Sequence, residues 1–194
     1  MALIPFDDRD GSIWMDGEIV PWRDAKAHTL SHGLHYASLV FEGERLYGGK
    51  IFKGREHTER LRSSARIMDF DLPITDDELD AAKQAVIGAN NILDGYVRAY
   101  CWRGSEMMAV SAQQTTAHLA IAAWEWPSYF DAEIKMKGIT LDIASWKRPS
   151  PESAPVHAKA AGLYMICTLS KHEAERKGFH DALMLDYRGY VAEA

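Results

Sequence analysis

The stretch over residues 117–126 is apolar at nearly every position. A strand of this composition is covered on both faces, so it belongs at the centre of a layered domain. A second strand is predicted over 96–102, in which Arg98 shares one face with Tyr96 and Tyr100. Arg98 could clamp a carboxylate between the tyrosines or lie on a solvated outer face. The residues by themselves favour the solvated position.

Two tight turns predict hairpins in the first half of the chain. Asp16-Gly17 and Gly48-Gly49 each separate short apolar runs and supply the positive φ angles that hairpin turns need. We therefore expect hairpins over 13–20 and 39–52.

Apolar residues at three-to-four spacing predict helices over 56–70 and 75–90. A capping box of Thr75 and Glu78 opens the second helix. In the first helix, Arg60 lies beside the buried stripe. There it could face an anion or pair with Glu56 one turn earlier, and the spacing does not decide between these positions.

A break at Pro127 divides the chain. We expect a small N-terminal domain over 1–130, a linker over 131–137 and the first part of another domain over 138–194. That part is predicted to hold a strand over 138–144, a helix over 163–177 that ends at Gly178, and a hairpin over 182–193.

Lys159 stands among alanines, and Glu152 is the only Asp, Glu, Lys or Arg within ten positions of it. Apolar surroundings make a lysine amine easier to deprotonate, which a covalent catalytic lysine requires. A lysine in such a run is more often a helix-surface residue whose amine reaches water. This residue alone therefore does not establish a site.

Composition argues against several functional classes. The net charge is −6 and no basic run is present, which argues against a nucleic-acid or anionic-membrane partner. Two cysteines make no disulfide framework, and no metal site is expected: His32 and His35 are better explained by capping or packing. The acidic start and the absence of a long apolar stretch favour a cytoplasmic protein.

Several motifs follow one another in a recognisable order. They read HYASLVFEG over 35–43, REHTERL over 55–61, YVR over 96–98, KAAGLY over 159–164 and DYRGYVAE over 186–193. In this combination the chain resembles the fold-type IV PLP-dependent aminotransferases, most of all the branched-chain amino acid aminotransferases. Ala37, Ala99 and Leu163 depart from the glycine, proline and asparagine that are usual in that family.

The resemblance implies a two-domain enzyme of mixed α+β and α/β class that uses pyridoxal 5′-phosphate (PLP). Lys159 would be the catalytic residue, holding PLP covalently and moving the substrate proton. Arg60 would bind the phosphate, Tyr164 the phenolic oxygen and Glu193 the pyridine nitrogen. The substrate pocket would be lined by Tyr36, Phe41, Tyr96, Arg98, Met108, Val110, Trp126 and Tyr129, with Met108 and Val110 on a loop from a partner subunit.

The implied reaction is transamination of L-leucine, L-isoleucine and L-valine with 2-oxoglutarate. The partners would be these small molecules and further copies of the chain in a homodimer or larger assembly, with no nucleic acid or membrane. Family members continue past residue 194, so we expect a longer natural protein whose larger pseudo-barrel domain begins here. The alternatives are a D-amino acid or (R)-amine transaminase, an aminodeoxychorismate lyase, or a non-catalytic fragment that serves as an interaction module.

Overall fold

The computed structural model describes residues 4–126 and 132–194. By their contacts, the residues group into two compact units. The first is Met1–Pro127 together with Ala158–Ala160, and the second is Ser128–His157 together with Ala161–Ala194. The short segment that carries Lys159 thus packs with the first unit, although it lies far beyond that unit's main stretch in sequence.

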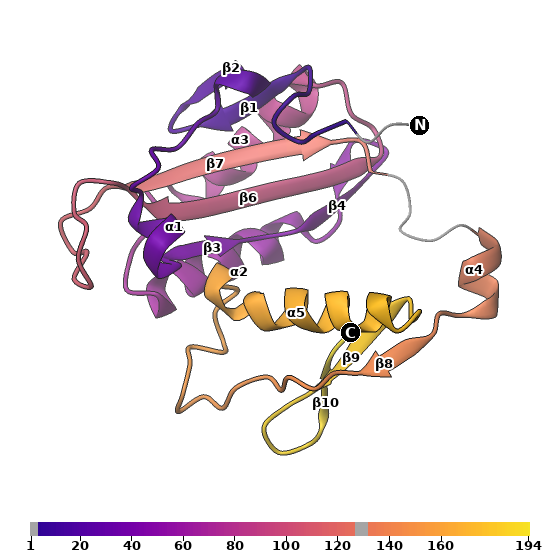
Figure 1. Cartoon of the computed structure of the whole chain (residues 1–194). Coiled ribbons are helices and arrows are strands. Elements are labelled where there is room, and N and C mark those ends of the chain that lie inside the picture. The colour runs from indigo at the N-terminus through magenta and orange to yellow at the C-terminus, as the bar shows by residue number, and fades with distance from the viewer. Residues whose placement is uncertain (1–3, 127–131) are drawn as a thin grey trace. The chain divides into compact units, whose positions relative to one another are not determined.

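An antiparallel sheet organises the first unit (Figure 1). Its strand order is β2-β1-β7-β6-β4-β5, and β3 also pairs with β6, beyond the end of β4. The strands are β1 (Ser12–Met15), β2 (Glu18–Pro21), β3 (Leu39–Phe41), β4 (Glu44–Tyr47), β5 (Lys50–Ile51), β6 (Gly95–Arg103) and β7 (Ala117–Trp124). The apolar run of the sequence is confirmed as a central strand, because β7 lies between β1 and β6 and is buried over most of its length.

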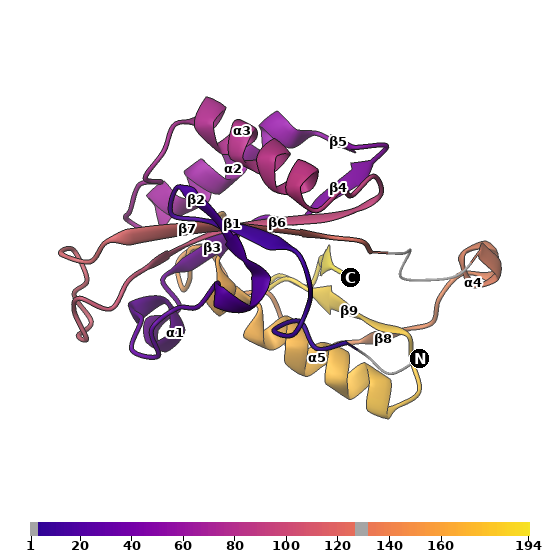
Figure 2. The same ribbon diagram turned by 90° about the horizontal axis from the view of Figure 1, so that it is seen from above.

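Helices α2 (Gly54–Ile67) and α3 (Asp76–Ala89) cover one face of this sheet, and the short α1 (His32–Tyr36) lies on the other side (Figure 2). The core between the layers includes Leu61, Leu79 and Leu119, each with no exposed surface. Burying a side chain of this size contributes about 1.5–3 kcal/mol.

The predicted turns and cap are confirmed. Asp16 and Gly17 have φ angles of 50° and 106°, and Gly48 and Gly49 have 55° and 76°. The capping box of Thr75 and Glu78 is complete. Helix α2 ends at Ile67, three residues before the expected end, because Asp69 adopts a left-handed conformation with φ of 61°.

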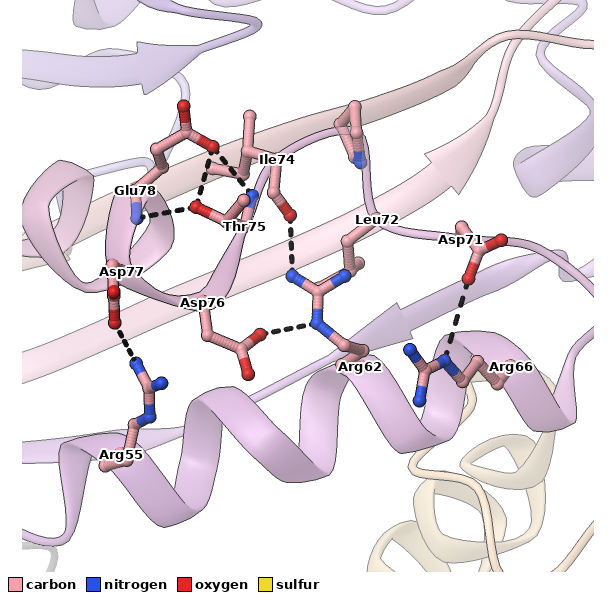
Figure 3. Close-up of a pocket in the computed structure, with 11 residues that line it drawn as sticks. Arg55, Arg62, Arg66, Asp71, Leu72, Ile74, Thr75, Asp76, Asp77 and Glu78 are labelled. Atoms are coloured by element: carbon pink, nitrogen blue, oxygen red, sulfur yellow. Dashed lines mark hydrogen bonds and ion pairs between the residues drawn. The ribbon is translucent and has the colours of Figure 1, made fainter.

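Charged side chains tie α2 to the start of α3 (Figure 3). Arg62 donates to the Ile74 carbonyl at 2.6 Å and pairs with Asp76. Arg55 pairs with Asp77 at 2.8 Å. These contacts fix the orientation of α2, which carries Arg60.

The second unit contains α4 (Ala132–Lys137), β8 (Leu141–Ile143), α5 (Met165–Arg176), β9 (Asp181–Leu185) and β10 (Val191–Glu193). Strand β9 pairs with β10 in antiparallel and with β8 in parallel orientation. The helix before Gly178 and the final hairpin are confirmed, and Gly178 has the expected positive φ of 85°. The expected strand over 138–144 is shorter, since only 141–143 pair with β9.

No helix in the described ranges 4–126 and 132–194 is long and apolar enough to cross a membrane.

Candidate active site

Lys159 is held through its main chain. Its N–H donates to the Ser64 hydroxyl at 2.9 Å, and its carbonyl accepts from the Phe41 N–H at 3.1 Å. The next residue, Ala160, makes a β-bridge with Val40. Ser64 belongs to α2 and Phe41 to β3, so a helix and a strand together fix the point from which the lysine side chain extends.

Phe41 brings two cationic side chains together. The Lys159 Nζ lies 5.0 Å from the centroid of the Phe41 ring, and the Arg98 Cζ lies 4.6 Å from it. Both distances lie within the range of cation–π attraction. An amine and a guanidinium therefore share one aromatic side chain, although they are 61 positions apart in sequence.

Arg98 is half-buried in the first unit's sheet, so the solvated outer position that the sequence favoured is wrong. Its Nη2 donates to the Tyr96 hydroxyl at 3.3 Å. Its Nε is buried and has no hydrogen-bond partner among the described residues. A buried guanidinium nitrogen without a partner is costly unless a ligand completes it, and a carboxylate fits that requirement.

Tyr96 connects this arginine to a group of aromatic rings. Its ring centroid lies 5.1 Å from that of Trp124 and 5.5 Å from that of Trp126. A Cβ placed on Gly43 would lie 1.8 Å from the Tyr96 hydroxyl oxygen. Gly43 is therefore required for the tyrosine to occupy this position.

Arg60 is paired with a carboxylate that the sequence did not single out. Its Nε lies 2.5 Å from Glu42 Oε1 and its Nη2 lies 2.6 Å from Oε2. The local partner that was considered, Glu56, instead pairs with Lys53. Burial raises the pKa of Glu42, but hydrogen bonds from Arg60 and His57 outweigh burial and hold that pKa below its ordinary value.

His32 connects Tyr36 to the loop over 104–116, whereas Phe41 connects Lys159 to Arg98. The Tyr36 ring stacks on the His32 ring at 4.5 Å, and His32 Nε2 lies 2.9 Å from the Ala109 carbonyl. Met108 and Val110 flank that carbonyl and are 44% and 85% exposed. The packing interpretation of His32 is confirmed, since it is 3% exposed and also bonds Ser38.

Tyr164 and Glu193 line one pocket of about 320 Å³ in the second unit. Cys167 also lines it, and burial raises the pKa of that thiol, so it stays protonated at neutral pH and is a poor nucleophile. Tyr164 contributes a phenol and Glu193 a carboxylate to this pocket, which Lys171, His172 and Asp181 also line.

Tyr129 falls outside the described residues. A wide pocket of about 660 Å³ lies between α2 and the residues that lead into α3 (Figure 3), and it contains none of the predicted site residues. Its arginines already pair with neighbouring carboxylates.

Sequence reasoning missed the residues that hydrogen-bond the predicted site residues and fix their positions. Glu42 contacts Arg60, Ser64 contacts Lys159, and His57 contacts Glu42. None of these three residues was predicted as a site residue. Glu42 carried a usable signal, because a carboxylate directly after the apolar strand residues 39–41 needs a cation or a hydrogen-bond donor. Ser64 carried no such signal, since a small hydroxyl on a helix is compatible with many positions.

Comparison with known proteins places these residues in a family context. Residues 39–194 match the family described as amino-transferase class IV. The probable branched-chain-amino-acid aminotransferase of Rickettsia conorii is 40% identical over 194 residues, and the match covers 100% of this chain and 65% of that protein. The branched-chain-amino-acid aminotransferase of Pseudomonas aeruginosa is 42% identical, with 96% of this chain and 62% of that protein covered.

Solved structures agree with the sequence matches. The branched-chain amino acid aminotransferase of Escherichia coli superposes with a TM-score of 0.90 at 38% identity, over 95% of this chain and 62% of that one. A second branched-chain amino acid aminotransferase, solved with pyridoxamine 5′-phosphate, gives the same TM-score, identity and coverage. The chain thus spans less than two thirds of the length of these relatives, and the expected fold-type IV class is confirmed for that part. From this match over most of its residues, the chain belongs to the class IV aminotransferase family.

Proposed function

We propose that the protein carrying this chain is a PLP-dependent transaminase that moves the amino group of L-leucine, L-isoleucine or L-valine to 2-oxoglutarate. The products are the branched-chain 2-oxoacids and L-glutamate. The observation that carries the proposal is the shared contact of Lys159 and Arg98 with Phe41, because it gathers an amine and an incompletely paired guanidinium at one place. We further propose that the protein forms a homo-oligomer and is located in the cytoplasm.

The residues present fit PLP by their chemistry. The Lys159 amine suits the aldehyde of PLP, and the Arg60 guanidinium suits its phosphate. In the second unit, the Tyr164 phenol and the Glu193 carboxylate line a pocket and suit the ring oxygen and the protonated ring nitrogen. Bound PLP supplies an electron sink for negative charge that develops at the substrate α-carbon.

Lys159 would carry the proton between substrate and cofactor. Its main chain is fixed on both sides by Ser64 and Phe41, so the flexible side chain moves from a defined origin. A positioned general acid–base of this kind contributes about 10²–10⁴-fold to a rate.

Arg98 would bind a substrate carboxylate through the buried Nε that lacks a partner among the described residues. Phe41, Tyr96 and Trp126 offer aromatic surface for an aliphatic side chain. Such a site has apolar walls for leucine and a cation for the second carboxylate of glutamate. Met108 and Val110, exposed on their loop, would complete the pocket of a neighbouring subunit.

A substrate screen tests this proposal. The purified protein with added PLP is given 2-oxoglutarate with either L-leucine or D-alanine, and glutamate formation is followed. We expect turnover of L-leucine and none in the Lys159→Ala variant. Turnover of D-alanine alone would favour a D-amino acid transaminase. A folded protein that takes up no PLP would favour a non-catalytic interaction module.

A further inference from the structure

Glu42 is a fully buried carboxylate in the short gap between β3 and β4. Both of its oxygens are engaged: Oε1 by Arg60 Nε at 2.5 Å, and Oε2 by Arg60 Nη2 at 2.6 Å and by His57 Nδ1 at 2.8 Å. Its own N–H donates to the Ala99 carbonyl at 2.8 Å, which fixes the backbone to β6. The carboxylate is therefore a rigid acceptor with a defined direction.

Arg60 differs from Glu42 in its exposure. The Glu42 side chain is 0% exposed, whereas that of Arg60 is 53% exposed. A pair that served only to fill the core would bury both partners. Here the buried Glu42 carboxylate accepts two hydrogen bonds from one edge of the Arg60 guanidinium, and the Arg60 side chain stays accessible to solvent. Two parallel hydrogen bonds on that edge fix the plane of the guanidinium as well as its position.

Strand β3, which precedes Glu42, and helix α2, which carries Arg60, also hold Lys159. Phe41, directly before Glu42, donates its N–H to the Lys159 carbonyl. Ser64 accepts from the Lys159 N–H and lies four residues after Arg60 on α2, one helical turn away. The junction of β3 and α2 therefore fixes Lys159 and Arg60 in a single frame within the first unit.

We propose that Glu42 is a positioning residue that orients the Arg60 guanidinium toward the phosphate of a phosphomonoester whose carbonyl carbon reacts with Lys159. The inference rests on the proposed function, since PLP is the ligand of that chemistry. His57 supports the same carboxylate from its second side, as its ring is four-fifths buried and bonds Oε2.

The test compares two ligands that differ only in phosphate. PLP and pyridoxal are titrated against the protein carrying this chain, and binding is followed by absorbance and by borohydride trapping on Lys159. Glu42→Gln keeps the shape of the side chain but replaces the charged carboxylate that pairs with Arg60 by a neutral amide. Loss of a charge-assisted pair predicts about 10- to 100-fold weaker PLP binding, with pyridoxal binding unchanged.

A double-mutant cycle separates positioning from general structural damage. With Arg60→Met as background, Glu42→Gln should weaken PLP binding no further, because the two residues act as one unit. His57→Gln, which removes one contact only, should weaken PLP binding by a smaller factor. Glu56→Gln is the matched control: it lies on the same helix, pairs with Lys53 and should leave PLP binding unchanged.

Three results would overturn this inference while leaving the proposed function in place. They are equal losses for PLP and pyridoxal in Glu42→Gln, an additive effect in the Arg60→Met background, and unchanged PLP binding in Glu42→Gln. A folded wild-type protein that binds neither ligand at Lys159 would overturn the proposed function, and this inference with it.

Discussion

Replacing Lys83 by methionine should destabilise the first unit strongly. Lys83 is 1% exposed, and its ammonium contacts Glu44 at 2.8 Å and the Thr58 hydroxyl at 2.8 Å. Glu44 is itself 0% exposed. Methionine keeps the length of the side chain but leaves the Glu44 carboxylate buried without its cation.

The magnitude follows from burial on both sides of the pair. Breaking a buried ion pair by removal of one partner costs about 3–5 kcal/mol. For a chain of this size, that lowers the melting temperature by about 6–20 °C. Urea unfolding followed by tryptophan fluorescence measures the loss, and Lys50→Met, at an exposed position on β5, is the matched control with a change within about 0.5 kcal/mol.

The effect should also depend on pH. Burial raises the pKa of Glu44 above its ordinary value of 4.5, while Lys83 opposes that rise. A carboxyl with a raised folded-state pKa favours the folded state when protonated and loses that contribution as the pH rises through the folded pKa. The deficit of Lys83→Met should therefore shrink on acidification, and Lys83→Met/Glu44→Gln should recover most of it. A single variant as stable as the wild type at neutral pH would refute the argument.

Three further predictions concern the site. Gly43→Ala places a Cβ 1.8 Å from the Tyr96 hydroxyl, so steady-state kinetics should show a raised KM for leucine with little change in melting temperature; unchanged kinetics would contradict this role. Arg98→Gln should lower kcat/KM for leucine by about 10- to 100-fold because the carboxylate loses its charge-assisted contact, and an unchanged value would exclude Arg98 as its ligand. Glu42 has a lowered pKa, so its stabilising contribution is present above pH 4.5 and is lost as the pH falls through the folded pKa. The stability difference between wild type and Glu42→Gln should accordingly vanish in acid, and a pH-independent difference in urea unfolding would contradict it.

Local signals in the sequence were enough for turns and caps. Thr75 and Glu78 cap α3 through atoms that are three residues apart. Asp16 and Gly17 have the positive φ angles that their residue types favour, although Asp16 also bonds Leu119, which is 103 positions away. The central strand was predictable for a related reason, since a continuous apolar run has few alternatives to burial.

Pairing between distant segments was not predictable from these signals. Lys83 lies on the buried side of α3 because Glu44, 39 residues away, receives its charge. Arg60 takes Glu42, 18 residues away, in place of a partner one turn along its helix. Periodicity and propensity report which face a residue occupies, but they do not report which opposite charge the fold brings to it.

The motifs were more informative than the physics of any one residue. Lys159 in isolation was compatible with a surface lysine. Its contacts with Phe41 and Ser64 required the fold. The resemblance links Tyr164 and Glu193 through one cofactor, and the structure places both in the lining of one pocket.

The most direct test of the account is borohydride reduction of the protein after incubation with PLP, followed by peptide mass mapping. The account predicts that the mass added by PLP is found on the peptide containing Lys159, and that Lys159→Ala abolishes this label. A folded protein that carries the label on another lysine, or carries none, would contradict the account.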